Sequence, residues 1–139
     1  MAQSLSAIYI HLIFSTKNRA PSIATEDETD LHKYFIGTLS GIDCPGIASN
    51  GMSDHVHLLF RLGKQKTISD LVKEVKIASS NWLKNRGSRY AGFHWHSGYG
   101  AFSVSQSMVE QVVCYIAKQK RTSPHYYVSG RVSQFLEAL

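Results

Sequence analysis

Two histidines, His55 and His57, stand two positions apart in the apolar stretch SDHVHLLF, which covers residues 53–60. A buried histidine is costly unless its ring nitrogens find partners, so this pair needs a chemical explanation. Residues i and i+2 of a β-strand point to the same face and lie about 7 Å apart along the chain. Two imidazoles at that spacing can bind one metal ion. The alternative is a pair held by hydrogen bonds on the sheet surface or covered by a helix.

Two polar residues further along the chain could join such a site. Tyr115 and Gln119 are four positions apart in an expected helix, so they lie one above the other on the same helix face. A tyrosine hydroxyl can attack phosphorus when a cation polarises the phosphate, and a glutamine carbonyl oxygen can complete a metal coordination shell. The alternatives are packing at a helix boundary for Tyr115 and simple exposure for Gln119.

The elements that would position these residues follow the order β-α-β-β-α-β, with further helices at the end. Hydrophobic periodicity separates strands, with a period of two, from helices, with a period near 3.6. The expected strands cover residues 7–16, 41–49, 55–62 and part of 93–105. The expected helices cover residues 25–39, 67–85, 107–120 and 132–139.

Local signals predict where several of these elements begin or turn. Thr25 is expected to cap the first helix, and the pair Ser107 and Glu110 has the spacing of a capping box for the third helix. Asn50-Gly51 indicates a hairpin turn between the second and third strands.

This order predicts an α+β fold of the ferredoxin-like kind, a four-stranded antiparallel sheet with two helices on one face. In the usual strand order of that fold, the first and third strands are neighbours at the centre. Their aliphatic residues would face the two helices, while His11, His55 and His57 would share the opposite, open face. These histidines should therefore face solvent or something docked on the sheet. All of residues 1–139 are expected to form a single domain.

Composition narrows the possible partners of this domain. The chain has 15 Lys+Arg against 10 Asp+Glu, a formal charge of +5, which favours nucleic acid over a membrane surface. Its apolar stretches are shorter than a membrane span, and the N-terminus lacks the basic region of a secretory signal. Cys44 and Cys114, in no metal-binding spacing, are typical of free thiols in a cytoplasmic protein.

Four stretches carry a resemblance to a known family, in the family's order and across nearly the whole chain. They are YIHLIFSTKNR at 9–19, MSDHVHLLF at 52–60, FHWHSGYGAFSVS at 93–105 and YIAKQ at 115–119. The chain resembles the small single-tyrosine HUH transposases of the insertion-sequence 200/605 type, which include the repetitive-palindrome-associated tyrosine transposases. The His-x-His pair followed by Tyr-x-x-x-Gln is the specific part of the likeness.

The resemblance implies a metal-dependent transposase that cleaves and rejoins single-stranded DNA. His55, His57 and Gln119 would bind Mg²⁺ or Mn²⁺, and Tyr115 would form a 5′-phosphotyrosine link and release a 3′-hydroxyl. The metal's identity rests on the likeness, because imidazole ligands would also suit Zn²⁺. Relatives recognise DNA hairpins at element ends and act as homodimers, in which the tyrosine helix can serve either subunit's histidines.

Some residues depart from the family pattern or compete for these roles. His96 stands where relatives often have glutamine, and it is either a contact for DNA or a residue without a role in the site. Tyr126 and Tyr127 compete with Tyr115 as nucleophiles, but neither has a glutamine one turn later. Trp95 and Tyr99 could stack on bases or lie in the core. Candidates for contact with the DNA backbone, each otherwise an ordinary solvated charge, are Lys17, Arg19, Lys73, Lys76, Arg86 and Arg89.

Two other functions compete with this interpretation. A non-catalytic nucleic-acid-binding domain with a ferredoxin-like sheet would stack bases on exposed aromatic residues of the central strands. Only Tyr9 is available for that here, among His11, His55 and His57. The third possibility is an inactivated relative that binds or regulates, which the intact His55, His57, Tyr115 and Gln119 set disfavours.

Overall fold

In the computed structural model of the chain, residues 6–119 and residue 135 are described. Four strands form one antiparallel sheet in the order β2-β3-β1-β4, so β1 and β3 are the central neighbours, as expected. The strands are β1 (Tyr9–Ser15), β2 (Gly46–Gly51), β3 (His55–Arg61) and β4 (Gly100–Val104). The helices are α1 (Thr25–Gly41), α2 (Ile68–Arg86) and α3 (Val109–Ala117). Short 3-10 turns cover η1 (Lys17–Arg19), η2 (Ser88–Tyr90) and η3 (Gln106–Met108).

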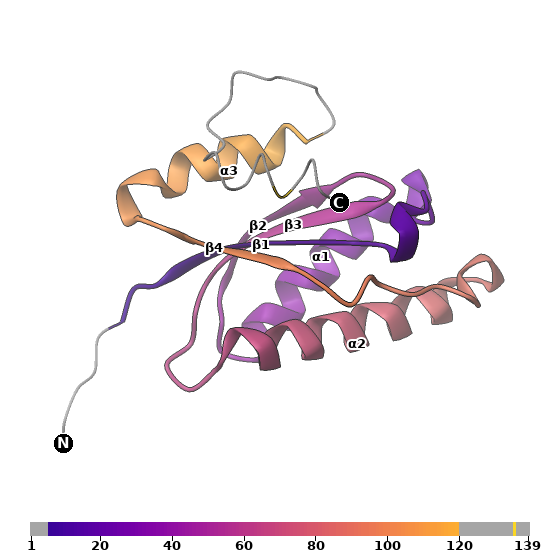
Figure 1. Ribbon diagram of the computed structural model, residues 1–139, viewed down its shortest axis with the longest axis horizontal. Helices are drawn as coiled ribbons and strands as arrows, with labels where there is room; N and C mark the ends of the chain where they lie inside the picture. The colour runs from indigo at the N-terminus through magenta and orange to yellow at the C-terminus, as the bar shows by residue number, and fades with distance from the viewer. Residues whose placement is uncertain (1–5, 120–134, 136–139) are drawn as a thin grey trace.

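The helices cover both faces of the sheet. Figure 1 shows α1 and α2 on one side of the strands and α3 on the other. The main core lies on the α1/α2 side, where Leu12 and Leu58 of the central strands meet Phe35 of α1 and Val75 of α2, all fully buried. The alternation of β1 and β3 produces this arrangement, because every second side chain points into the same layer. The predicted α+β, ferredoxin-like fold is confirmed.

Local boundaries differ from the sequence expectations in two helices. Thr25 is the first residue of α1 and not its cap; Ala24 takes the cap position, and its backbone N–H donates to the Tyr90 hydroxyl. The capping box of Ser107 and Glu110 is wrong as well. The turn η3 precedes α3, no side chain caps the helix, and the Ser107 hydroxyl lies 3.2 Å from that of Ser105. At α1 the contact with Tyr90 thus takes the place of the expected cap, and at α3 the turn η3 does so.

The strands also begin and end differently from the expected ranges. β2 begins after Pro45 and includes Asn50 and Gly51, so the hairpin turns at residues 52–54. Gly51 is needed there, because a Cβ would collide with the carbonyl oxygen of His55 on the facing strand. β4 covers only the second half of the expected range, and Trp95 joins Thr16 through an isolated bridge. Tyr126, Tyr127 and most of the expected closing helix lie outside the described residues.

Among the described residues, every helix is too short or too polar to span a lipid bilayer.

Candidate active site

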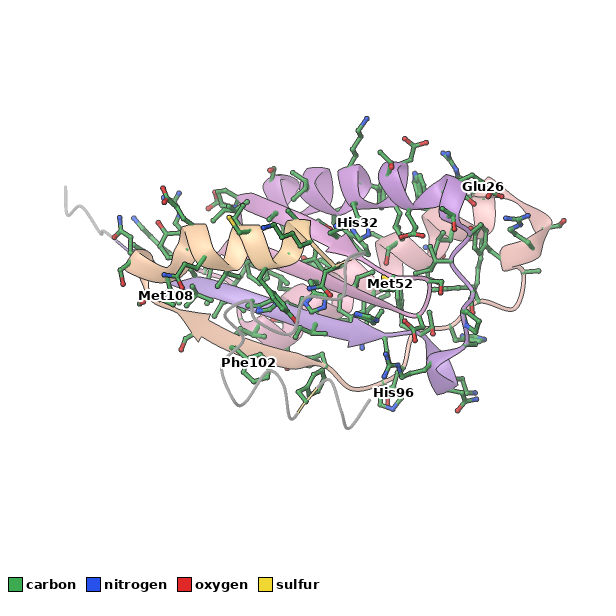
Figure 2. All side chains as sticks on the ribbon, turned by 90° about the horizontal axis from the view of Figure 1, so that it is seen from above. Glu26, His32, Met52, His96, Phe102 and Met108 are labelled. Atoms are coloured by element: carbon green, nitrogen blue, oxygen red, sulfur yellow. The ribbon has the colours of Figure 1, made fainter. Side chains whose placement is uncertain are left out.

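The sheet face that carries the histidines is covered by α3. The apolar stripe of this helix packs Val112 and Ile116 against Leu59 of β3, and all three side chains are buried. The stripe has the spacing expected for a helix that buries one side, and burial of its aliphatic groups holds α3 on the sheet. Of the two expected situations, solvent or a docked element, the second is found, and the docked element is the chain's own helix. Figure 2 shows α3 lying across the strands, with Met108 just before its first turn.

Three histidines gather beneath this helix. His11 of β1 is 3% exposed, His55 of β3 is 8% exposed, and His57 is fully buried. The ring centroid of His57 lies 5.2 Å from that of His11 and also 5.2 Å from that of His55. The strand register creates the cluster, because His57 pairs with Ile13 and so lies diagonally across from His11. The expected placement of all three on one face is thus correct.

Each histidine of the pair has its Nδ1 atom engaged by a neighbour. Nδ1 of His57 lies 2.9 Å from Nε2 of His11, and Nδ1 of His55 lies 2.8 Å from the Asp54 carboxylate. The buried Nε2 of His57 has no hydrogen-bond partner. Metal-binding histidines have this arrangement: one ring nitrogen is oriented by a carboxylate or another acceptor, and the other nitrogen bears the lone pair for the metal.

Burial keeps the rings of His11 and His57 neutral. Burial lowers the pKa of His11 to about 4. Burial also lowers the pKa of His57 well below its ordinary value, and the nearby rings of His11 and His55 add to the effect. A neutral imidazole can donate a lone pair to a cation, whereas a protonated one cannot. The His57 ring can therefore act as a metal ligand at neutral pH.

Tyr115 and Gln119 approach the same cluster from α3. The Tyr115 ring meets the His57 ring edge-on at 5.6 Å and the His11 ring at 6.0 Å. Burial raises the pKa of the Tyr115 hydroxyl, an effect that the Gln119 side chain partly opposes. Gln119 lies just past the end of α3, and its side-chain amide donates to the Tyr115 carbonyl at 3.1 Å. The Gln119 side chain also partly opposes the lowering of the His57 pKa. The four residues selected from the sequence are thus close together.

Whether these residues suit a metal ion depends on their donor atoms. Within the described ranges, no group of three or more His, Cys, Asp or Glu side chains could hold a metal. Two histidines could supply imidazole nitrogens, so a third protein donor must be of another type, such as the Gln119 amide oxygen. The unpartnered, buried Nε2 of His57 is the observation that fits a cation at this place.

Two residues of the site were missed in the sequence. Asn50 of β2 pairs with His57 in the sheet, and its side-chain amide donates to the carbonyls of Ile116 and Ala117 at 3.1 and 3.3 Å. It thereby fastens the last turn of the tyrosine helix to the histidine strands. The Asn50-Gly51 pair was interpreted only as a turn signal, although a strand position next to His57 would have been a hint.

Asp54 is the second missed residue, and it connects one DNA-contact candidate to the histidines. Its carboxylate accepts from Arg19 Nε at 3.1 Å on one oxygen and lies beside His55 Nδ1 on the other. The signal was its position immediately before His55. Arg19 therefore lies at the edge of the histidine cluster, in the turn that also contains Lys17.

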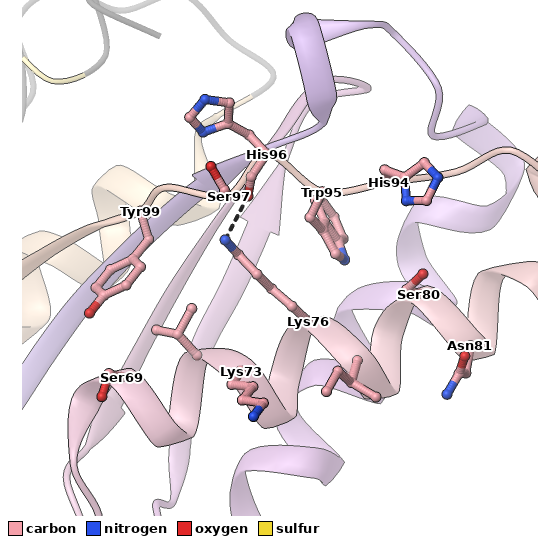
Figure 3. Close-up of a pocket in the computed structure, with 12 residues that line it drawn as sticks. Ser69, Lys73, Lys76, Ser80, Asn81, His94, Trp95, His96, Ser97 and Tyr99 are labelled. Carbon is pink, nitrogen blue, oxygen red and sulfur yellow. Dashed lines mark hydrogen bonds between the residues drawn. The ribbon is translucent and has the colours of Figure 1, made fainter.

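The basic candidates of α2 and η2 lie in the layer on the opposite face of the sheet. Lys76 donates to the carbonyls of His96 and Gly98 at 2.7 and 3.0 Å, and burial lowers its pKa. Figure 3 shows Lys76 reaching from α2 to the segment that carries His96, above Lys73. Arg86 pairs with Asp27 and Asp30, and Arg89 pairs with Glu26. These bonds give Lys76, Arg86 and Arg89 a structural role, while contact with DNA stays a prediction for all the basic candidates.

The two aromatic candidates differ in their surroundings. Trp95 packs against Phe14 and Phe93, each with ring centroids at 4.8 Å, and its indole N–H donates to Ser79. Its ring therefore packs against the core and is partly buried. Tyr99 is exposed beside Lys76.

Comparison with known proteins decides the family. The family described as "Transposase IS200 like" matches residues 4–119. This chain belongs to the IS200-like transposase family. The ISDra2 transposase TnpA of Deinococcus radiodurans is 29% identical over 116 residues, which cover 78% of this chain and 81% of that protein.

Solved structures agree with this membership. A crystal structure described as a transposase from Deinococcus radiodurans R1 superposes with a TM-score of 0.65 at 26% identity, over 86% of this chain and 98% of that one. A REP-associated tyrosine transposase bound to a REP hairpin superposes with a TM-score of 0.60, over 85% of this chain and 69% of that one. The second is 12% identical, so it supports the fold of this IS200-like transposase alone.

Proposed function

We propose that this IS200-like transposase cleaves and rejoins single-stranded DNA through a covalent bond to Tyr115. The observation that carries the proposal is the position of the Tyr115 ring, 5.6 Å from the ring of His57, whose buried Nε2 has no partner. A tyrosine hydroxyl beside an imidazole whose free ring nitrogen can bind a cation is an arrangement that suits metal-assisted phosphoryl transfer.

The reaction makes one bond and breaks another at phosphorus. The Tyr115 oxygen bonds to the scissile phosphate, its phenolic proton is lost, and the bond to the 3′ oxygen breaks. That oxygen takes up a proton, which leaves a free 3′-hydroxyl and a 5′-phosphotyrosine. Attack by a 3′-hydroxyl on the phosphotyrosine reverses the step and rejoins DNA. Because burial raises the pKa of Tyr115, the hydroxyl is protonated at rest and needs activation.

His55, His57 and Gln119 would hold Mg²⁺ or Mn²⁺. The bound ion would polarise the scissile phosphate and orient it for attack. Asp54 and His11 orient the two histidines by engaging their Nδ1 atoms, and the α3 stripe keeps water away from His57.

The partners in this proposal are DNA hairpins at the element ends and a second copy of the chain. The hairpin is supported by the REP-hairpin complex of the structurally similar tyrosine transposase. The homodimer rests on the family resemblance, and its subunits can exchange tyrosine helices; in the described chain Tyr115 lies over its own histidines. The rival role, base stacking on the open sheet, is disfavoured because α3 occupies that face.

Thermal unfolding in Mn²⁺ tests the metal part of the proposal. Binding to the folded state alone raises its stability by about 2.7 kcal/mol at a concentration 100 times Kd, which shifts the melting temperature by several degrees. The wild type and His94→Ala, an exposed histidine on another segment, should show the shift, whereas His55→Ala should not. An equal shift in His55→Ala, or none in the wild type, would contradict this site.

A further inference from the structure

A cavity opens beside the histidine cluster, at the end of β1. It has a volume of about 470 Å³, and its lining includes Ser15, Asn18, Arg19, His96 and Phe135. Cavities of this size accommodate small ligands in proteins. Nothing in the reaction proposed above uses it.

Two connections place this cavity next to the reacting centre. Ser15, on the lining, pairs directly with His55 across the β1–β3 ladder, where facing Cα atoms lie about 4.5–5.5 Å apart. Arg19, also on the lining, bonds to the Asp54 carboxylate that engages His55 Nδ1. A group bound in the cavity would thus lie one strand spacing from a proposed metal ligand.

The lining has the chemistry of a nucleotide site. Among the described residues, the lining contains the cation Arg19, the amide of Asn18 and the aromatic ring of Phe135, and none of its side chains is acidic. Asn18 and Arg19 both have left-handed backbone angles, with φ of 59° and 51°. Consecutive non-glycine residues seldom adopt this conformation, and such strain is concentrated at ligand sites.

His96 closes the cavity on the side of the 94–99 segment. Figure 3 shows its ring turned away from α2, on the far side of the segment from Lys76. The Gly98 N–H donates to His96 Nδ1 at 3.0 Å, and Lys76 donates to the His96 carbonyl, so both the ring and its backbone are fixed. A fixed, flat ring can stack on a nucleobase.

We propose that this cavity receives the unstacked base of a nucleotide next to the scissile phosphate, with His96 and Phe135 as its walls and Asn18 reading the base edge. This inference rests on the proposed function, because it places the base relative to the phosphate that Tyr115 attacks. Enzymes that act on nucleic acid gain selectivity by holding an unstacked base in such a pocket. The cavity thus makes cleavage depend on one particular base.

The test measures binding and so does not require catalysis. Tyr115→Phe protein is titrated into fluorescein-labelled single-stranded oligonucleotides tiled across both flanks of its own gene, and Kd is measured by fluorescence anisotropy. The tightest binder is then resynthesised with one abasic site at each position in turn. One position should weaken binding by about tenfold, the size expected for a lost stacking contact.

The variants assign that position to the cavity. In Tyr115→Phe/His96→Ala the penalty at that one position should fall to about twofold or less. In the matched control Tyr115→Phe/His94→Ala it should remain, because His94 lines the groove against α2 and not this cavity, whereas His96 borders both. Asn18→Gly, which keeps the left-handed backbone, should bind all four bases there equally well.

The possible outcomes separate the cavity from the catalytic proposal. Identical abasic profiles in the two histidine variants, or no oligonucleotide bound at all, would overturn the base site. A Tyr115-dependent covalent adduct together with identical abasic profiles would refute the base site and leave the proposed cleavage intact. A loss of affinity at one abasic position, in a protein that forms no covalent adduct, would support the base site and refute the proposed cleavage.

Discussion

Nε2 of His11 and Nδ1 of His57 lie 2.9 Å apart, so a side-chain hydrogen bond joins the first and third strands directly beneath the tyrosine helix. If His57 Nε2 is to carry a lone pair, Nδ1 carries the proton and donates to His11. A His11 whose pKa is about 4 is neutral at physiological pH and can accept that bond. His11 thus orients His57 and fixes its tautomer.

Removing this orienting contact should weaken metal binding. We expect His11→Ala to lower Mn²⁺ affinity by about 10- to 100-fold, the usual cost of losing such a partner, and His11→Gln to retain more because its amide oxygen can still accept. Isothermal titration calorimetry checks both, with His94→Ala as the control. A His11→Ala protein that melts earlier but binds Mn²⁺ as tightly as the wild type would reduce His11 to a packing residue.

Asn50 should control how firmly the tyrosine helix is held. Asn50→Ala removes the bonds to the carbonyls of Ile116 and Ala117, which should cost about 1 kcal/mol of stability and speed amide hydrogen exchange at the end of α3. Ser107→Ala, exposed before the helix starts, serves as the control. Unchanged exchange in α3 would show that its apolar stripe alone fixes the helix.

Asp27 should make the fold sensitive to acid. It is 8% exposed and accepts hydrogen bonds from Tyr90 and Arg86, which hold its pKa below the ordinary value. Because the folded pKa is the lower one, the stabilisation is present above the unfolded pKa of about 3.9 and is lost as pH falls through the folded value.

Denaturant titrations of Asp27→Asn at several pH values check this expectation. The variant should be less stable than the wild type by about 1 kcal/mol at pH 7, since Arg86 is partly exposed and water screens the pair. That difference should shrink below about pH 4. Asp30→Asn, whose carboxylate is half exposed, should change stability less. If the difference in unfolding free energy between wild type and Asp27→Asn did not vary with pH, the charge of the Asp27 carboxylate would not be its cause.

The sequence predicted the histidine face because alternation within one strand is a local property. Placing His55 and His57 on the face opposite Val56 and Leu58 needed only the period of two. The contact of His11 with His57 depends instead on the register between β1 and β3, which no local pattern states. That contact was therefore out of reach.

The position of α3 shows the same division. The sequence predicted the apolar stripe of α3 and the spacing of Tyr115 and Gln119. It did not predict the surface against which the stripe packs. The structure answers with Leu59, on the histidine side. The expected cap at Thr25 failed for a similar reason, since Tyr90, distant in sequence, donates to Asp27 and accepts from Ala24. Partners remote in sequence likewise determine the bonds of Lys76 and Arg86.

Covalent capture tests the central claim most directly. The protein is mixed with Mn²⁺ and labelled single-stranded DNA tiled across both flanks of its own gene, and the products are separated on a denaturing gel beside Tyr115→Phe. We predict a protein–DNA adduct that survives denaturation in the wild type and is absent in the variant. An adduct that persists in Tyr115→Phe would contradict the account and move the nucleophile to another residue, with Tyr126 and Tyr127 the first to test.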